Sequence, residues 1–404
     1  MIKREQYMEQ LRPFFDKPVV KVMTGIRRCG KSVMLELIRD ELVAQGRPEE
    51  HMLLLNFESK LLPFSKTADD AFAYLAAYVR QTPGRKYLFL DEVQELPDWE
   101  TMVNALMIDC DVDLYITGSN AKLLSGELAT YLGGRYVEIK VYPFSFLEVR
   151  DILAAQGKPI GESEAFLHYL TYGGMPFIYA YQIEPQAALQ YLTDIFDSIL
   201  LKDVAQRNKI RDIGLFQKVL TYFIAGIGTT WSATSIQKYL KSEHRTISPE
   251  TLYNYIEYCK EAGILHLVSR EDIIGKKLLQ FQEKIYLTDH GLREAVYGNN
   301  QRDVQQVLEN IVYMELLRRG YTVTVGKNEA WEVDFAAQKG ADKLYVQVAY
   351  LLADEQTVER EFRALEAIPD NYPKYVVTMD EIDRSRNGIK HRNIRRFLQM
   401  DAFL

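Results

Sequence analysis

Residues 25–32 constrain the fold of this 404-residue chain more than any other segment. They form a complete G-x-x-x-x-G-K-[ST] pattern, Gly25-Ile26-Arg27-Arg28-Cys29-Gly30-Lys31-Ser32. An apolar run over residues 18–23 precedes the pattern and an amphipathic stretch over residues 32–38 follows it. The pattern therefore lies between a predicted buried strand and a predicted helix, which is the context that it requires. We expect a phosphate-binding loop for a nucleoside triphosphate.

Each residue type in this loop suits that chemistry. The two glycines let the backbone curl until successive N–H groups face one phosphate chain. Lys31 supplies a cation at the β- and γ-phosphates, Ser32 supplies a hydroxyl for Mg²⁺, and the N-terminus of the following helix favours an anion. The residues expected to contact the nucleotide are Gly25, Ile26, Arg27, Arg28, Cys29, Gly30, Lys31, Ser32 and Val33.

Two adjacent carboxylates, Asp91 and Glu92, end a second apolar run over residues 86–90. The carboxyl ends of parallel strands are where open α/β sheets hold their ligands. Asp91 is expected to hold Mg²⁺ through water, and Glu92 to polarise the water that attacks the γ-phosphate. An acidic pair after a strand is otherwise a solvated loop. Its position one strand after a phosphate loop favours the catalytic interpretation and predicts an ATPase with its own base.

Two further polar residues are open to two interpretations each. Asn120 follows a predicted strand over residues 112–118 and is a candidate sensor of the γ-phosphate, although a turn that caps the next helix also explains it. Arg135 precedes a predicted strand over residues 136–141. It is a candidate arginine finger for the ATP of a neighbouring subunit, and equally a surface arginine after a Gly-Gly turn.

These motifs, in this order, resemble the bacterial and archaeal AAA-superfamily ATPases that are fused to a C-terminal domain of unknown function. The resemblance covers nearly the whole chain. It implies an α/β protein: a P-loop AAA-type ATPase with a parallel sheet, followed by a helical linker, a winged helix and a small α/β nuclease-like domain. The matching segments are residues 23–32, 90–94, 117–120, 134–135, 142–145, 172–176, 201–204, 308–312 and 332–335.

Composition limits the alternatives. A length of 404 residues with 47% hydrophobic residues is enough for two or three domains with full cores. No long uncharged apolar run or signal-peptide core is present, and Cys29, Cys110 and Cys259 share no metal-binding spacing. We therefore expect a cytoplasmic protein without a membrane partner. A net charge of −7 argues against a protein that coats nucleic acid, but not against one basic face.

The pattern along the chain predicts four segments. Residues 1–145 alternate strands and helices around the phosphate loop, with an added strand between those that carry Lys31 and Asp91. Residues 146–209 are predicted to form a helical lid or linker. Residues 210–300 read as a winged helix, with Ser248 and Pro249 opening its second helix and strands over 264–268 and 284–287. Residues 301–404 form a small α/β unit.

The winged helix is mildly basic, because Lys and Arg slightly outnumber Asp and Glu between Arg207 and Arg293. It is expected either to bind DNA or to serve only as a protein-packing module. Cations expected to meet DNA phosphates are Lys238, Lys241, Arg245, Lys276 and Lys277.

The C-terminal segment resembles the PD-(D/E)XK nuclease core, but its site is degenerate. Glu309 and Asp334 match the acidic positions, whereas the E-x-K positions read Gln347-Val348-Ala349. A neutral glutamine adds no charge for Mg²⁺, and alanine cannot replace the lysine. Glu332 lies on the same strand face as Asp334. We expect no nuclease activity.

Three functions remain. The leading one is a Mg²⁺-dependent ATP hydrolase whose cycle repositions the winged helix and nuclease-like domain on DNA or on an unidentified protein partner. A homo-oligomer is expected if Arg135 acts on a neighbouring subunit. The second is an ATP-gated DNA-binding regulator with little turnover. The third, a DNA-cutting ATPase, is disfavoured by the degenerate site.

Overall fold

The computed structural model describes residues 2–118, 132–157, 160–273, 275, 277–298, 300–328 and 331–403. Its contacts divide the chain into two units. Unit 1 consists of Met1–Pro143 with Glu261–Gly263, and unit 2 consists of Phe144–Lys260 with Ile264–Leu404. Three of the four segments expected from the sequence therefore belong to one unit.

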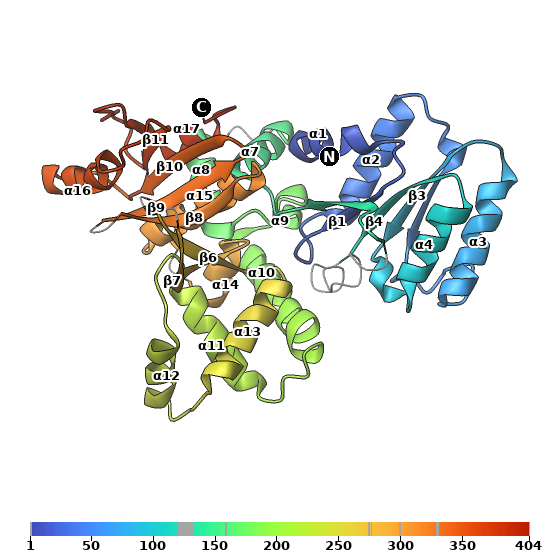
Figure 1. The fold of residues 1–404 in the computed structure, drawn as a ribbon, viewed down its shortest axis with the longest axis horizontal. Coiled ribbons are helices and arrows are strands. Elements are labelled where there is room, and N and C mark those ends of the chain that lie inside the picture. The colour runs from blue at the N-terminus through green and yellow to red at the C-terminus, as the bar shows by residue number, and fades with distance from the viewer. Residues whose placement is uncertain are drawn as a thin grey trace. The chain divides into compact units, whose positions relative to one another are not determined.

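A five-stranded parallel sheet forms the centre of unit 1 (Figure 1). Its order is β2-β3-β4-β1-β5, so β4 lies between the strand that leads into residues 25–32 and the strand that ends at Asp91, as the sequence predicts. The strands are β1 (Val20–Thr24), β2 (Met52–Asn56), β3 (Lys86–Asp91), β4 (Val112–Thr117) and β5 (Tyr136–Lys140).

Helices cover this sheet because their apolar faces match it. Buried side chains of α3 and α4 pack with Val20, Val22, Leu88 and Leu114 in one hydrophobic core. Thr67 starts α3 by accepting a hydrogen bond from the Asp70 N–H. The helices of unit 1 are α1 (Glu5–Leu11), α2 (Lys31–Ala44), α3 (Ala68–Gln81) and α4 (Trp99–Asp109), with 3₁₀ turns at Arg12–Phe14, Glu49–His51 and Val93–Glu95.

Unit 2 begins with the helical segment that the sequence predicts. Ser145 and Glu148 cap its first helix reciprocally, each side chain accepting the other's backbone N–H. Gly173 interrupts the segment with φ +70°, and a Cβ there would lie 1.9 Å from Oδ1 of Asp289. The elements are α7 (Phe146–Ala155), α8 (Glu162–Tyr172), α9 (Pro176–Ala180), α10 (Pro185–Ser198) and a π-helical stretch (Ile199–Gln206).

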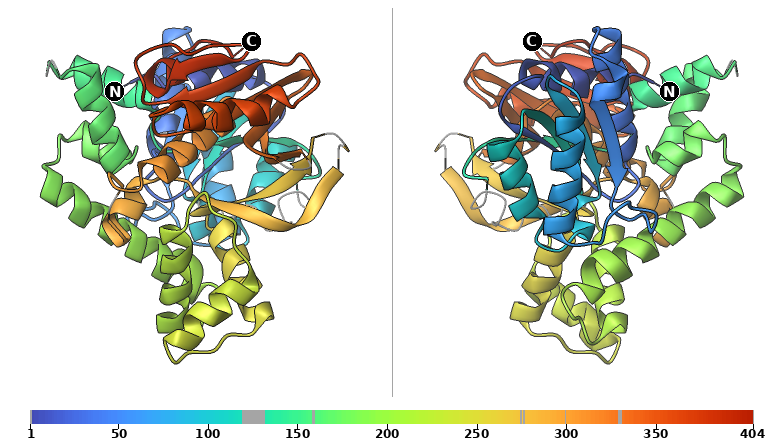
Figure 2. Two further views of the ribbon diagram at one scale, coloured as in Figure 1. Left: turned by 90° about the vertical axis from the view of Figure 1, so that its left-hand side faces the viewer. Right: turned by 90° about the vertical axis from the view of Figure 1, so that its right-hand side faces the viewer.

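Three helices and an antiparallel hairpin follow in residues 210–300. The hairpin and the helices that begin after Ser232 and Ser248 lie where the sequence predicts them, whereas the helix Ile213–Ala225 was not predicted. Ser232 caps the second helix and Ser248 accepts from the Thr251 N–H at the start of the third. Figure 2 shows the hairpin strands side by side in gold. The elements are α11 (Ile213–Ala225), α12 (Ala233–Ser242), α13 (Pro249–Glu261), β6 (Leu265–Asp272) and β7 (Lys277–Leu287).

The hairpin is part of a larger sheet. Strand β6 pairs in parallel with β8, with Arg270 opposite Val325, which gives a seven-stranded order β12-β11-β10-β9-β8-β6-β7. Backbone hydrogen bonds therefore cross the domain border that the sequence predicts at residue 300. The remaining elements are α14 (Gly291–Val296), α15 (Val304–Arg318), β8 (Thr322–Asn328), β9 (Trp331–Lys339), β10 (Asp342–Val348), α16 (Glu355–Glu366), β11 (Lys374–Thr378), β12 (Lys390–Asn393) and α17 (Ile394–Leu398).

Strand β12 and helix α17 were not predicted. They are short, and their sequence is rich in Arg and Lys, which hides the apolar pattern of Ile394, Phe397 and Leu398. Among the residues that the structure describes, none of the helices combines the length and apolar character needed to cross a bilayer.

Candidate functional site

The loop at residues 25–32 joins β1 to α2 and has the backbone that its glycines allow. Gly25 has φ +151°, and a Cβ there would lie 2.2 Å from the carbonyl oxygen of Val141. Gly30 has φ +102° and is the N-cap of α2. The loop therefore ends at a helix N-terminus, where free N–H groups and the helix dipole favour a phosphate.

An arginine outside the motif supports this loop. Arg4 lies just before α1 and is 5% exposed. Its guanidinium donates to the carbonyl oxygens of Cys29 at 3.1 Å and Tyr142 at 2.8 Å. Sequence reasoning missed Arg4, because these partners are far away along the chain and no local pattern marks the contact.

Lys31 is buried at the base of the loop. Its Nζ donates to the carbonyl oxygens of Gly25 and Ile26 at 3.2 and 3.4 Å. It also lies 3.9 Å from Oε1 of Glu92. The lysine that motif reasoning assigns to phosphate thus lies within ion-pair distance of the carboxylate assigned as the base. Ser32 and Val33 are exposed at the first turn of α2.

Asp91 is held by polar side chains from three elements. Its Oδ1 accepts from the hydroxyls of Ser32 at 3.1 Å and Thr117 at 2.5 Å. Its Oδ2 accepts from the Asn56 amide at 2.8 Å. Ser32 and Asp91 thus lie together, as the two motifs predict. The hydroxyl and carboxylate oxygens are hard donors that fit a bound Mg²⁺.

Asn56 and Thr117 were not among the expected site residues. They are the last residues of β2 and β4, the neighbours of β3 in the parallel sheet. The register brings them beside Asp91, so a polar residue at the end of each predicted strand was the available signal.

Glu92 lies in a constrained turn directly after β3. Its φ of +51° is in the left-handed region, which is uncommon for a residue with a side chain. Its N–H donates to the Thr117 hydroxyl at 3.0 Å, and its Oε2 accepts a short hydrogen bond from Nε2 of Gln94. The backbone thus fixes where this carboxylate points.

Of the two residues with open interpretations, Asn120 and Arg135, the structure describes only Arg135. Asn120 lies outside the described residues. Arg135 precedes β5, and its carbonyl oxygen accepts from the N–H of Val20, at the opposite end of β1 from the loop. Its guanidinium donates to Oδ1 of Asn104 at 2.7 Å. Arg135 therefore does not reach the phosphate loop of its own subunit.

The C-terminal acidic residues do come together, around a lysine that the sequence did not assign. Nζ of Lys284 on β7 lies 3.5 Å from Oε2 of Glu309, 2.9 Å from Oε1 of Glu332 and 3.3 Å from Oδ1 of Asp334. We call these four residues the lysine-centred cluster. Sequence reasoning considered the E-x-K positions and did not assign Lys284 of β7, which the shared sheet brings to the acidic residues.

Gln347 lies beside this cluster. Its Oε1 accepts from the N–H of Asp334 at 3.2 Å and its Nε2 donates to Glu361 of α16 at 2.9 Å. Arg270 adds a second cation, 2.7 Å from Oε2 of Glu332. Within the described residues, no three His, Cys, Asp or Glu side chains have a metal-binding arrangement.

Burial decides the protonation in the cluster. It raises the pKa of Glu309 to about 8, with a further rise from neighbouring Asp334 and an opposing effect of Lys284. Burial alone would lower the pKa of Lys284, but the three neighbouring carboxyls together outweigh burial and raise this pKa above its ordinary value. Burial likewise raises the pKa of Asp334, against the effect of neighbouring Lys284.

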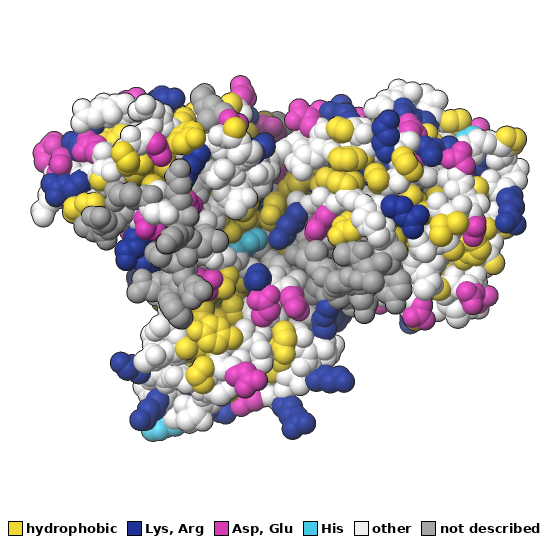
Figure 3. Space-filling model, viewed as in Figure 1, with side chains coloured by type: hydrophobic (Ala, Val, Ile, Leu, Met, Phe, Trp, Pro, Cys, Tyr) yellow, Lys and Arg dark blue, Asp and Glu magenta, His cyan; other side chains and the backbone are white. Residues whose placement is uncertain are grey.

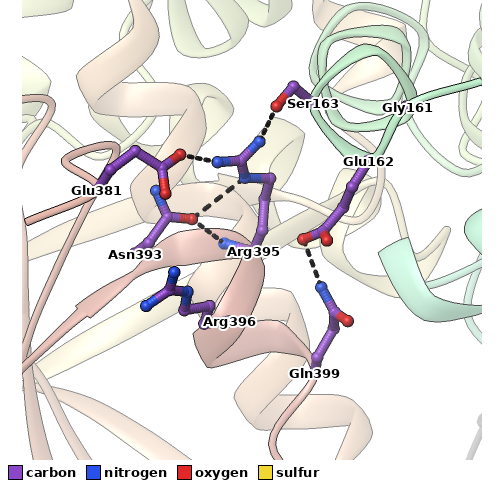
Figure 4. Close-up of a pocket in the computed structure, with 8 residues that line it drawn as sticks. All are labelled: Gly161, Glu162, Ser163, Glu381, Asn393, Arg395, Arg396 and Gln399. Carbon is purple, nitrogen blue, oxygen red and sulfur yellow. Dashed lines mark hydrogen bonds and ion pairs between the residues drawn. The ribbon is translucent and has the colours of Figure 1, made fainter.

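A separate hollow of about 510 Å³ lies between the start of α8 and α17 (Figure 4). Its polar groups satisfy one another: the Arg395 guanidinium bonds to Glu381, Ser163 and Asn393, and Gln399 donates to Glu162 at 2.7 Å. None of the site residues expected from the sequence lines it.

The comparisons agree with the geometry of unit 1. A family model described as an AAA domain matches residues 17–150, and one described as a domain of unknown function matches residues 163–303. The structure resembles a Walker-type ATPase of Pyrococcus abyssi with a TM-score of 0.51 and 16% identity, covering 73% of this chain and 95% of that chain. At this identity the likeness concerns the fold alone, which is that of a P-loop ATPase.

Relatives extend over both units. An uncharacterized protein of Haemophilus influenzae is 38% identical over 378 residues, which are 94% of this chain and 93% of the relative. An uncharacterized protein of Methanocaldococcus jannaschii is 30% identical over 363 residues, 87% of this chain and 79% of the relative. The chain belongs to the family of these proteins, and its residues 17–150 match the AAA domain.

Proposed function

We propose that this protein hydrolyses ATP with Mg²⁺. The observation that carries the proposal is the meeting of three elements: Ser32 of the phosphate loop contacts Asp91 of β3, and Glu92 follows in a fixed turn within 3.9 Å of Lys31. A hydroxyl, two carboxylates and a lysine are the groups that phosphoryl transfer to water requires.

The roles follow from what each side chain can do. The N–H groups of residues 25–33 and the α2 N-terminus bind the phosphates, and Lys31 exchanges its carbonyl partners for phosphate oxygens. Ser32 and Asp91 would hold Mg²⁺, which supplies charge neutralisation at the β- and γ-phosphates. Glu92 takes a proton from the attacking water. Asn120 as a γ-phosphate sensor is part of the proposal on sequence grounds.

A homo-oligomer follows if Arg135 acts as a finger. Because Arg135 lies at the far end of β1 from the loop, the proposed finger would have to act on the ATP of another subunit. A guanidinium there would neutralise charge that develops on the transferred phosphoryl group.

The same proposal includes movement of unit 2. Closure of unit 1 around ATP would reposition a winged helix, formed by α11 to β7, and the nuclease-like part, on DNA or on a protein partner. The support from charge is modest. Lys238 and Lys241 are exposed, but Arg245 lies 3.5 Å from Asp212 and Lys218 lies 2.6 Å from Glu243. Figure 3 shows exposed side chains of both charges over α11, α12 and α13. The second function, an ATP-gated DNA-binding regulator with little turnover, shares these residues.

We also propose that the nuclease-like part does not cut DNA. Lys284 lies where Glu309 and Asp334 would have to receive a metal ion, and Gln347 adds no charge. The cluster is therefore a structural ion-pair network in this proposal.

The test is ATP turnover and affinity in three proteins, with and without DNA, on size-separated species. Lys31→Ala should abolish productive ATP binding, because it removes the buried ammonium group at the base of the loop. Glu92→Gln should keep ATP bound while turnover falls about 100-fold or more. Wild-type turnover in Glu92→Gln would refute the role of the base, and undetectable turnover of the wild-type protein with tight binding would favour the gated regulator.

A further inference from the structure

We infer that Gln94 positions the water that attacks the γ-phosphate, together with Glu92. The inference deepens the proposed ATP hydrolysis and rests on it. It assigns a water-positioning role to an amide two residues beyond the base, within unit 1.

A short 3₁₀ turn, Val93–Glu95, places Gln94 next to Glu92. Val93 is fully buried and fixes the turn in the core, and the Glu95 N–H donates to the Glu92 carbonyl at 3.0 Å. The turn therefore directs the Gln94 side chain back toward the Glu92 carboxylate, where the two side chains form a hydrogen bond.

Chemistry fixes which way the amide faces. An ionised carboxylate only accepts hydrogen bonds, so the NH₂ group of Gln94 must face Oε2 of Glu92. The carbonyl Oε1 then faces elsewhere. Among the residues that the structure describes, this atom is buried and accepts no hydrogen bond. A buried acceptor without a donor costs about 1–3 kcal/mol, so a water that donates to this oxygen would remove that cost.

The second oxygen of Glu92 is the other half of the arrangement. Its Oε1 lies 3.9 Å from Nζ of Lys31. In a nucleotide complex Lys31 is drawn to the phosphates, which frees Oε1 to accept from water. In the proposed complex Oε1 of Gln94 turns out of its buried position. Together with Oε1 of Glu92 it then accepts hydrogen bonds from the two O–H groups of one water molecule, and a lone pair of that water is left for phosphorus.

The step balances in this arrangement. The bond between the water oxygen and the γ-phosphorus forms, and the bond from that phosphorus to the bridging oxygen of ADP breaks. One water proton passes to Glu92, and the other stays on the phosphate oxygen that was the water, after guidance by Gln94. Gln94 is neutral throughout, so it orients the water without competing for the proton.

A purely structural role for the Gln94 amide explains less. The turn is already held by the hydrogen bond of the Glu92 N–H to Thr117 at 3.0 Å and by that of the Leu96 N–H to Val93 at 3.1 Å. A structural role also gives no use to the buried carbonyl oxygen.

The experiment compares Gln94→Met, which keeps the length but removes both polar groups, with Gln94→Ala. Gln81→Met is the matched control, because Gln81 is exposed at the end of α3. ATP affinity and turnover are measured on the full chain. We expect kcat of both Gln94 variants to fall about 10–100-fold while ATP affinity stays within about twofold, with no change in the control.

A double variant separates positioning from structure. If Gln94 acts on the water that Glu92 activates, Glu92→Gln with Gln94→Met should be no slower than Glu92→Gln alone. Unchanged kcat in the Gln94 variants, lost ATP affinity in both, or multiplicative losses in the double variant would overturn the inference. Such results with an active wild-type protein leave the proposed hydrolysis intact, whereas absence of wild-type turnover would refute both.

Discussion

Lys284 on β7 and Asp334 on β9 form a buried ion pair, with 3.3 Å between Nζ and Oδ1. The pair joins the hairpin of residues 265–287 to the α/β part of unit 2 by charge, in addition to the backbone pairing of β6 with β8. Glu309 and Glu332 share the same ammonium group. The ammonium group of Lys284 thus lies within ion-pair distance of three carboxyls.

Removal of this lysine should expose the carboxyls to metal ions. We expect Lys284→Met to destabilise the protein by about 3–5 kcal/mol, because it leaves buried carboxylates without their counter-ion. Mn²⁺ should then raise the Tm of the variant but not of the wild-type protein. Lys260→Met, which alters an exposed lysine, is the control. Thermal unfolding with and without Mn²⁺ decides the matter, and an equal Mn²⁺ response of both proteins would contradict the structural role of Lys284.

Glu309 should make stability depend on pH. Its pKa is about 8 in the folded protein, chiefly because of burial, against an ordinary value of 4.5. Between these values the folded state binds more protons than the unfolded state, so stability falls as pH rises. We expect Glu309→Gln to weaken this decline by on the order of 1 kcal/mol per pH unit. Urea unfolding from pH 5 to 8 measures it, with exposed Glu257→Gln as the control; equal slopes would show that Glu309 does not titrate in this window.

Arg135 is tested by mixing subunits. Arg135→Ala should lower turnover while ATP affinity per subunit stays nearly unchanged, because the finger meets only the transition state. Mixing it with Lys31→Ala protein should partly restore turnover, since each variant lacks a different half of a shared site. Turnover of the mixture is the measurement, and no rescue among subunits known to exchange would exclude action on a neighbour.

The DNA proposal predicts a salt-dependent affinity. Replacing Lys276 and Lys277 together by Gln should make the dependence of DNA affinity on salt less steep, because fewer phosphates are neutralised. ATP turnover without DNA should not change. Fluorescence anisotropy over a salt series measures the slope. If the wild-type protein has no DNA affinity at low salt, with or without ATP, the segment is a protein-packing element.

Local features of the fold could be predicted because their causes are local. Ser145, Ser232 and Ser248 cap helices through partners three residues away, and the loop of Lys31 carries its own glycines. The meeting of Ser32 with Asp91 also followed from the motifs.

Other contacts depend on register and on packing between distant segments. Asn56 contacts Asp91 only because β2 and β3 pair in one register. Arg4 donates to the carbonyl oxygen of Tyr142, which lies 138 residues later in the chain. Lys284 was assigned to a separate domain, since no sequence pattern states that β6 joins β8. The E-x-K positions alone therefore could not predict that Lys284 belongs to the lysine-centred cluster.

The pairing of β6 with β8 bears on how such a chain can be inherited. A gene junction near residue 300 would leave β8 as an open edge, with unsatisfied N–H and C=O groups that invite aggregation. A junction near residue 143, between the two units, cuts neither sheet. Recombination should therefore exchange unit 1 as a whole. The helices α11 to α13, the hairpin of β6 and β7, and the lysine-centred cluster should be inherited together.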